Sequence, residues 1–316
     1  MSLGSLDIIR PGLLTTVQDV GRYGHQALGV PVAGPMDAFS HRLANQLVGN
    51  EVDAATLEVT LIGPEMIIGA ETTLAIAGAH FEATCDGQPV PMAASFPVRP
   101  GQRLKFGRIV QGARAYVGVA GGIQTAAVLG SRATHLVSRM GGVDGRALIT
   151  GDRVPVLARP SARPSRKAAG LTLPTGGRAQ LRVVPGPQDE WFRADALKAV
   201  VGVSFRISPR SNRMGYRLEG PALARVRAGE LISEPVGMGA IQVPGAGEPI
   251  LLMADRQTAG GYPKIGHVIS ADLPLAGQLA PGDFIEFILC SRQEAVTALI
   301  ARERQLLRYA DLKDAS

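Results

Sequence analysis

The chain has 316 residues, of which 46% are apolar and 19% are charged, so it is long enough for about two globular domains with full hydrophobic cores. No uncharged apolar run approaches the roughly 18 residues that a membrane-spanning helix needs, and the N-terminus lacks the features of a secretion signal. These features predict a soluble, cytoplasmic protein.

The net charge of +6 is concentrated in one segment. Between Asp152 and Asp189 seven basic side chains occur without an acidic one, and the rest of the chain is close to neutral. A neutral remainder lacks the broad basic face that phosphate-backbone binding requires, so we expect no nucleic-acid and no membrane partner. Cys85 and Cys290 are too few for a disulfide framework or a cysteine zinc site, and we expect reduced, packed thiols.

Residues 1–157 are predicted to form a β-rich domain with one helix. Gly or Pro follows most of its short strand-like runs within a few residues, which is typical of barrels and sandwiches. The helix is expected to begin at Pro35 and to end before Gly49, because the apolar residues between them recur with helical spacing. The strand-like runs are residues 56–61, 73–77 and 115–119.

Residues 158–178 are rich in Pro, Ala, Arg and Ser and are predicted to be a solvated linker to a second β-rich domain, residues 179–316. In that domain one helix is expected from Asp189 to Gly202. A last helix is expected to start at Ser291, where serine and a glutamate three residues later have the spacing of a capping box. The strand-like runs are residues 180–184, 230–233, 249–254 and 283–289.

A weak internal repeat links the two halves. Residues 18–24 and 255–262 both run from an acid through a glycine turn to a tyrosine, and each is followed by an aspartate and a Leu-Ala-x-Gln-Leu sequence. Duplication of one barrel unit and coincidence between glycine-rich loops both explain this pattern.

Several common catalytic motifs are absent from the sequence. No lysine follows a glycine, so there is no phosphate loop of the type G-x-x-x-x-G-K-[ST]. There is also no G-x-S-x-G elbow, no G-x-G-x-x-G fingerprint and no H-E-x-x-H helix, and the five histidines show no metal-ligand spacing. We therefore expect no metal site.

Glycine-rich loops carry the polar residues that folding does not require. In residues 253–264, Asp255 could act as a base or orient a donor, and nearby amide, hydroxyl and glycine backbone groups could bind a carbonyl or carboxylate. Residues 208–218 hold several arginines suited to a carboxylate or phosphate. Residues 231–244 and 16–25 follow the same pattern. For each loop the alternative is a structural turn whose polar groups satisfy one another.

Taken together, these loops closely resemble the allophanate hydrolase subunit 2 or KipA-like family, which includes the C subunit of bacterial ATP-dependent 5-oxoprolinase and matches half of the urea carboxylase carboxyltransferase domain. The resemblance extends from about Leu6 to Phe287. The motifs that carry it include Gln18-Asp19-Val20-Gly21-Arg22, Gly34-Pro35-Met36-Asp37, Asn212-Arg213-Met214-Gly215, Gly239-Ala240-Ile241-Gln242-Val243-Pro244 and Gly261-Tyr262-Pro263.

The resemblance implies a mainly β fold of two cyclophilin-like β-barrel domains. It also implies a KipI-like B subunit and a LamB/YcsF-like A subunit as partners, and ATP-dependent opening of the lactam of 5-oxoproline to L-glutamate by the assembled complex. One alternative is a carboxyltransferase subunit that moves carboxylate from carboxybiotin to a urea-like or amide acceptor, with biotin on another chain. The other is a regulatory binding partner of a KipI-like protein.

Pro235 departs from the family pattern, because glycine is expected after Ser-Glu; proline removes an amide donor and stiffens the loop. We expect the loops around residues 212, 234–242 and 255–264 to converge on one cleft at a barrel mouth. The candidate catalytic residues are Asp255, Glu234 and Tyr262; the candidate substrate-binding residues are Asn212, Arg213, Gln242, Gln257, Thr258, Gly260, Gly261 and Lys264; and a candidate N-terminal site comprises Gln18, Asp19 and Arg22.

Overall fold

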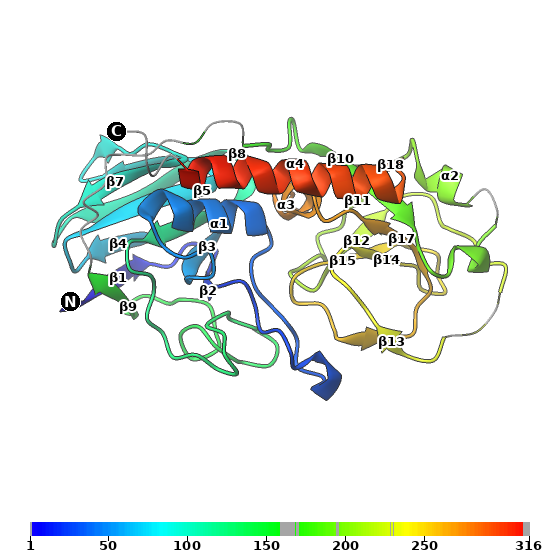
Figure 1. Ribbon diagram of the computed structural model, residues 1–316, viewed down its shortest axis with the longest axis horizontal. Coiled ribbons are helices and arrows are strands. Elements are labelled where there is room, and N and C mark those ends of the chain that lie inside the picture. Colours follow the sequence, from blue (N-terminus) through cyan, green and yellow to red (C-terminus); the bar gives the residue numbers. More distant parts are fainter. Residues whose placement is uncertain are drawn as a thin grey trace. The chain divides into compact units, whose positions relative to one another are not determined.

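The computed structural model describes residues 2–158, 168, 171–193, 196–227, 229 and 231–311. The chain divides into two compact units, each composed mainly of strands (Figure 1). The N-terminal unit comprises Met1–Arg22, Ala33–Leu173 and Gln305–Ser316, and the C-terminal unit comprises Tyr23–Val32 and Pro174–Arg304. Residues 159–167 and 169–170 of the predicted linker, 158–178, lie outside the described residues, so the domain boundaries stay a prediction.

The N-terminal unit is built on one nine-stranded antiparallel sheet. Its strand order is β2-β3-β8-β4-β1-β9, and β5 pairs with β6, β7 and β8. The long strands β5 and β8 shift register between Gly78 and Ala83, and such bulges bend a sheet. The strands are β1 (Ser2–Arg10), β2 (Leu14–Gln18), β3 (Thr56–Thr60), β4 (Glu65–Ile68), β5 (Thr72–Cys85), β6 (Gln88–Pro89), β7 (Ala94–Val98), β8 (Arg103–Val119) and β9 (Arg153–Ala158).

Helix α1 (Ala38–Val48) packs on β5 and β8 through its predicted apolar stripe. The helix begins after Asp37 rather than at Pro35, because the Asp37 carboxylate accepts a hydrogen bond from the amide nitrogen three residues later at 2.9 Å. A Cβ atom at Gly118 of β8 would lie 2.7 Å from the carbonyl oxygen of Ala44. Glycine at this position therefore lets the helix lie close to the sheet.

The C-terminal unit contains a closed barrel of seven strands. Its order is β10-β17-β14-β15-β12-β11-β18, and the parallel pairing of β10 with β18 closes the ring. A separate two-stranded sheet joins β13 to β16. The strands are β10 (Arg178–Pro185), β11 (Ser204–Ile207), β12 (Gly215–Glu219), β13 (Glu234–Pro235), β14 (Ala240–Gln242), β15 (Ile250–Leu252), β16 (Ala259–Gly260), β17 (Lys264–Val268) and β18 (Phe284–Leu289).

The helices of the C-terminal unit agree in part with the predictions. The helix expected from Asp189 is a 3₁₀ turn, η2 (Asp189–Trp191), followed by α2 (Ala196–Val200). The predicted capping box is confirmed, because the Glu294 carboxylate accepts from the Ser291 amide at 2.7 Å and the Ser291 hydroxyl accepts from the Glu294 amide at 3.2 Å. The remaining helices are η1 (Gln26–Leu28), α3 (Leu273–Gly277) and α4 (Arg292–Asp311), the last of which ends in the N-terminal unit.

The internal repeat does not mark equivalent strands. Asp19 follows β2, and the next strand comes only after helix α1. Asp255 follows β15, and strands β16 and β17 both precede helix α3. In addition, β2 pairs with β3 alone, whereas β15 pairs with β12 and β14. Coincidence between loops therefore explains the pattern better than duplication.

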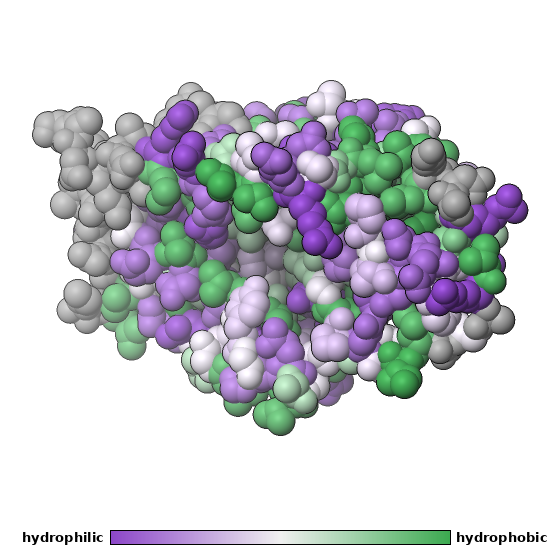
Figure 2. Space-filling model, turned by 45° about the vertical axis from the view of Figure 1, so that its right-hand side comes forward, coloured by the Kyte–Doolittle hydropathy of each residue, from purple (hydrophilic) through white to green (hydrophobic). Residues whose placement is uncertain are grey.

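The predicted mainly β fold class is confirmed, with one closed barrel and one long, bent sheet. None of the described helices is long and apolar enough to cross a membrane. Figure 2 shows hydrophobic residues at the surface in several groups separated by hydrophilic ones. Scattered exposed apolar residues are common on proteins, so none of these groups identifies a site by itself.

Candidate active site

A hollow of about 240 Å³ in the C-terminal unit brings together four of the predicted site residues. Three of the four, Asn212, Gln242 and Gln257, carry side-chain amides, and the fourth is Tyr262. We call this space the amide hollow. It is lined by Arg210, Asn212, Met214, Gly215, Arg217, Gln242, Ile250, Leu252, Gln257 and Tyr262.

The amide hollow lies on the outer face of the barrel. Strand pairing aligns Tyr216 with Leu251 and Leu251 with Ile241, and all three are at most 1% exposed because they point into the barrel core. Their neighbours Arg217 and Ile250 therefore point outward, where they line the hollow. The expected cleft at a barrel mouth is thus wrong in position, because strand alternation places these side chains on the outside of the barrel.

Gln242 provides the most distinctive chemistry of the hollow. Its side chain is 1% exposed, and its Oε1 accepts a hydrogen bond from Nε2 of Gln257 at 3.3 Å. Its own Nε2 is buried and has no hydrogen-bond partner among the described residues. A buried amide donor that lacks a partner costs free energy, so this group is suited to a ligand carbonyl or carboxylate oxygen.

Gly260 makes room for the two glutamines. A Cβ atom at this position would lie 2.8 Å from Nε2 of Gln242 and 3.2 Å from Nε2 of Gln257. The position is fixed by the short pairing of β13 with β16, in which Glu234 faces Gly260. The predicted glycine is therefore needed for side-chain packing in the site.

The candidate base Asp255 is held by an arginine. Nε and Nη2 of Arg213 donate to the two carboxylate oxygens of Asp255 at 3.0 and 2.9 Å, and the two side chains are 4% and 3% exposed. The Asp255 amide also donates to the Arg213 carbonyl at 2.8 Å. Since both oxygens are engaged in charge-assisted hydrogen bonds, the geometry favours the orienting role over the base role. The pair connects the loop after β15 to the start of β12.

A second charged group lies around Glu234. Its carboxylate forms an ion pair with the buried ammonium of Lys264 and accepts from Nε2 of Gln188 at 2.6 Å. The Lys264 amide in turn donates to Oε1 of Gln188 at 3.2 Å. The hydrogen bond from Lys264 lowers the pKa of Glu234, so this carboxyl stays ionised and serves as an acceptor rather than an acid.

Gln188 belongs to this group although sequence reasoning did not identify it. Only its place after a Gly-Pro turn distinguishes it in the sequence, and that signal is weak. The half-buried His267 is a further neighbour, and burial, followed by the charge of Lys264, lowers its pKa. Neither Glu234 nor Lys264 lines the amide hollow.

The remaining predicted residues of this unit act through the backbone. The Thr258 carbonyl accepts from the Val236 amide at 3.1 Å, which continues the strand pair beyond Pro235. A Cβ atom at Gly261 would lie 2.7 Å from the Leu231 carbonyl oxygen, so glycine lets these chains approach. Thr258, Gly260 and Gly261 thus position the hollow without lining it.

The candidate N-terminal site is organised around Asp19. Its carboxylate accepts from the Gly21 amide at 3.0 Å, from the Ser131 hydroxyl at 2.6 Å and from the Arg132 amide. Such bonds anchor a loop, and they leave this carboxylate with little capacity for a ligand.

Arg22 and Gln18 anchor the same loop. The Arg22 side chain is fully buried and donates to the carbonyls of Val128 at 2.8 Å and Ala133 at 3.0 Å; burial lowers its pKa. Nε2 of Gln18 donates to the Thr134 carbonyl at 3.1 Å. These contacts support the structural-turn alternative for residues 16–25.

Among the described residues, no group of three or more His, Cys, Asp or Glu side chains could hold a metal ion. Cys85 is buried and Cys290 is half-buried, both are free, and burial raises the pKa of each thiol. The site is a small hollow of amides and cations on a β-barrel, supported by the buried Arg213–Asp255 pair and by the ion pair of the buried Lys264 with the partly exposed Glu234.

Comparison with known proteins assigns this class of structure to a family. The carboxyltransferase domain, subdomain A and B, matches residues 28–289. The C subunit of the 5-oxoprolinase of Escherichia coli (strain K12) is 40% identical over 305 residues, covering 96% of this chain and 97% of that protein. The urea amidolyase of Saccharomyces cerevisiae is 34% identical and covers 92% of this chain, which spans only 17% of that protein.

A solved structure gives the same result. The crystal structure of the K. lactis urea amidolyase matches with a TM-score of 0.91 and 30% identity over 98% of this chain, which spans 20% of that chain. The chain therefore belongs to the carboxyltransferase-domain family, as the resemblance predicted.

Proposed function

We propose that this chain is the C subunit of a heteromeric, ATP-dependent 5-oxoprolinase that opens the lactam of 5-oxoproline to L-glutamate. The similarity to the Escherichia coli C subunit supports this proposal, because it covers nearly the full length of both chains. In this proposal the partners are a KipI-like B subunit and a LamB/YcsF-like A subunit, and the complex is cytoplasmic, where ATP is available.

The observation that carries the proposal is the chemistry of the amide hollow. A lactam presents a carbonyl oxygen and an N–H group side by side, and 5-oxoproline adds a carboxylate and a saturated ring. The unpartnered Nε2 of Gln242 suits the carbonyl oxygen, and the side-chain amides of Asn212 and Gln257 lie in the same hollow. The apolar side chains of Ile250 and Leu252 would contact the ring.

A cation for the carboxylate lies in the same hollow. The exposed Arg217 guanidinium has no side-chain partner among the described residues, and Arg210 faces Glu248 only at 3.8 Å. An arginine binds a carboxylate with two parallel hydrogen bonds, so Arg217 provides both affinity and orientation. The buried ion pair between Arg213 and Asp255 then holds the start of strand β12, which carries Arg217.

The proposal assigns binding and orientation to this chain and the use of ATP to the assembled complex. No side chain of the hollow is an activated nucleophile, and the two nearby carboxylates are paired with cations. ATP supplies the driving force for opening a stable amide when it is bound by the complex. The isolated chain is therefore proposed to have little or no hydrolase activity.

The alternative function is transfer of carboxylate from carboxybiotin to a urea-like or amide acceptor. The K. lactis urea amidolyase match supports it, and the amides of the hollow also suit urea. Urea itself has no carboxylate, so in this alternative Arg217 would face the carboxylate that carboxybiotin carries. A regulatory role as a binding partner of a KipI-like protein would require neither reaction.

One experiment separates these functions. The purified chain is assayed with and without both partner subunits for ATP-dependent release of glutamate from 5-oxoproline, and in parallel for carboxylation of urea by carboxybiotin. Glutamate release only by the full mixture supports the proposal. Carboxylation without glutamate release supports the alternative, and binding of the KipI-like chain without either reaction supports the regulatory role.

A further inference from the structure

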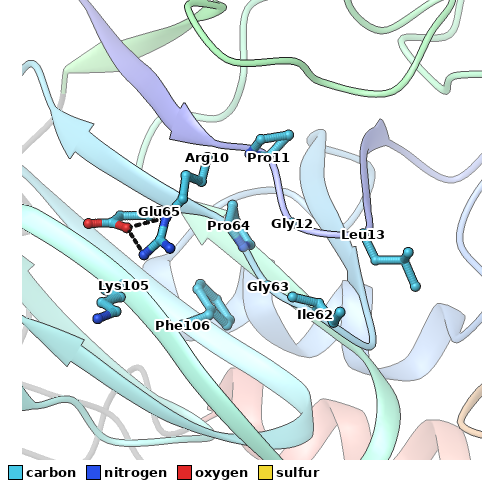
Figure 3. A pocket seen from close by; sticks show the side chains of 10 residues that line it. All are labelled: Arg10, Pro11, Gly12, Leu13, Ile62, Gly63, Pro64, Glu65, Lys105 and Phe106. Atoms are coloured by element: carbon cyan, nitrogen blue, oxygen red, sulfur yellow. Dashed lines mark hydrogen bonds and ion pairs between the residues drawn. The ribbon is translucent and has the colours of Figure 1, made fainter.

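A second hollow, of about 560 Å³, lies in the N-terminal unit, and no step proposed above uses it. Figure 3 shows that two turns and one strand enclose it: the turn from β1 to β2, the turn from β3 to β4, and strand β8. We call it the turn hollow. It is lined by Arg10, Pro11, Gly12, Leu13, Ile62, Gly63, Pro64, Glu65, Lys105 and Phe106.

The rim of the turn hollow is apolar. Leu13 and Ile62, one from each turn, are 59% and 62% exposed, whereas Phe106 beneath them is 6% exposed. Two large aliphatic side chains held mostly in water at one edge of a concave surface form a candidate contact for apolar groups of another molecule. The exposure of Leu13 and Ile62 supports a contact surface because the same hollow also carries a surplus of positive charge.

The other side of the turn hollow is positive. The nearly buried Glu65 carboxylate forms ion pairs with both Arg10 and Arg103, so one negative charge is shared by two guanidiniums. These contacts lower the pKa of Glu65 against the effect of its burial, so it stays ionised. The exposed Lys105 ammonium lines the hollow and has no partner among the described residues. A carboxylate from outside is the natural complement of this surplus charge.

The turn hollow is preformed. Gly12 has a φ of +75°, and a Cβ atom there would lie 2.2 Å from the Ile62 carbonyl oxygen, which also accepts from the Leu13 amide at 2.9 Å. Leu61 adopts a φ of +58°, which is uncommon for a leucine. The proline in each turn further limits motion, so a ligand would not have to order these turns.

We propose that the turn hollow docks a partner polypeptide through a short segment that carries an acidic side chain beside one or two large apolar ones. The carboxylate pairs with Lys105 and Arg10, and the apolar side chains cover Leu13 and Ile62. The charge of the hollow selects an acidic segment over a basic one. This inference depends on the proposed function, in which the chain works with separate subunits.

The test measures binding of the full chain to each purified partner, the KipI-like and the LamB/YcsF-like chain, by calorimetry. Lys105→Glu and Leu13→Glu are expected to weaken the affinity for one partner at least tenfold, and raising the salt concentration is expected to weaken the wild type more than Lys105→Glu. Arg108→Glu is the matched control: it reverses the charge of an exposed residue of the same strand, outside the hollow, and is expected to bind like the wild type.

Three outcomes would overturn the inference: wild-type affinity in both hollow variants, an equal loss in Arg108→Glu, or an effect on the KM for a small substrate without any change in partner affinity. The rate of glutamate release, measured at a saturating concentration of the partner, separates this inference from the proposed function. If the hollow variants bind the partner more weakly but release glutamate at the wild-type rate once the partner is saturating, both the inference and the proposed function are supported. If the wild-type complex forms and the hollow variants weaken it, but the complex releases no glutamate, then the proposed function is refuted and this inference is not.

Discussion

Gln257 donates a hydrogen bond to Gln242 over 3.3 Å, and this contact fixes which end of the Gln242 amide remains free. Because Oε1 of Gln242 is the acceptor, its Nε2 is left as a buried donor beside Gly260. The pair thus presents a donor without a partner inside a small hollow, within the part of the chain that the structure describes. The hydrogen bond between Gln257 and Gln242 connects strand β14 to the loop after β15. The proposal that this site binds a ligand can therefore be tested by replacing single residues.

Replacing Gln242 with alanine should weaken substrate binding, because it removes the donor proposed to contact the lactam carbonyl. Loss of one such hydrogen bond is worth about 1 to 2 kcal/mol, which corresponds to roughly a tenfold fall in kcat/KM of the assembled complex, mainly through KM. Steady-state kinetics of glutamate release measures this. Gln124→Ala, a partly buried glutamine of the other unit, is the control and should leave kcat/KM unchanged. Equal kinetics for both variants would remove Gln242 from the binding site.

Gly260→Ala should disturb the same amide pair without unfolding the protein. The added methyl group would lie 2.8 Å from Nε2 of Gln242 and would have to displace one glutamine. We expect an increase in KM of about tenfold, the scale of one displaced hydrogen bond, and an almost unchanged melting temperature. Gly245→Ala provides the comparison, since a methyl group there meets no atom within 4 Å. A Gly260→Ala complex with wild-type KM would show that the glutamine positions do not govern binding.

Asp255→Asn distinguishes an orienting carboxylate from a catalytic base. Because Arg213 is buried and donates to both oxygens of Asp255, the neutral amide leaves a buried guanidinium without its counter-charge. Breaking such a pair costs about 3 to 5 kcal/mol, so the melting temperature should fall by several degrees. Asp7→Asn, which breaks the exposed pair with Arg153, should cost less than about 1 kcal/mol. A stable Asp255→Asn complex with a roughly 100-fold loss of turnover would instead identify a base.

These residues also show how far the sequence could predict the structure. Local signals were sufficient for the capping box at Ser291 and for the apolar stripe of α1, because both depend on neighbours within one or two turns. The composition of the glycine loops also identified Asn212, Gln242, Gln257 and Tyr262, which line one hollow.

The sequence alone could not predict which side chains contact each other when they are far apart in the chain. Arg213 and Asp255 are 42 residues apart, and nothing local indicates that they form a buried pair rather than a free base and a ligand clamp. The outer-face position of the hollow follows from strand register, which a short strand such as β14 does not specify by its own pattern. Gln188 was missed for the same reason, since its contacts with Glu234 and Lys264 are 46 and 76 residues away.

We expect the acid stability of the N-terminal unit to depend on His41, which is buried in helix α1. Its Nδ1 lies 2.9 Å from the Thr56 hydroxyl, and burial lowers its pKa from 6.5 to about 4. Between these two values the unfolded chain binds a proton that the folded chain does not, so the free energy of unfolding falls as the pH falls through this window. The full loss is about 3 kcal/mol, at 1.36 kcal/mol for each pKa unit.

His41→Gln should remove this dependence, because glutamine can still bond to Thr56 but does not titrate. Denaturant unfolding of the full chain at several pH values between about 4 and 7 measures the effect, and His80→Gln, an exposed histidine of β5, is the control that should keep the wild-type slope. The glutamine variant is expected to be less stable than the wild type at neutral pH and to lose less stability on acidification. If both variants lose stability in parallel with the wild type, His41 is not the group that senses acid, and the buried carboxylates of the unit must account for the dependence.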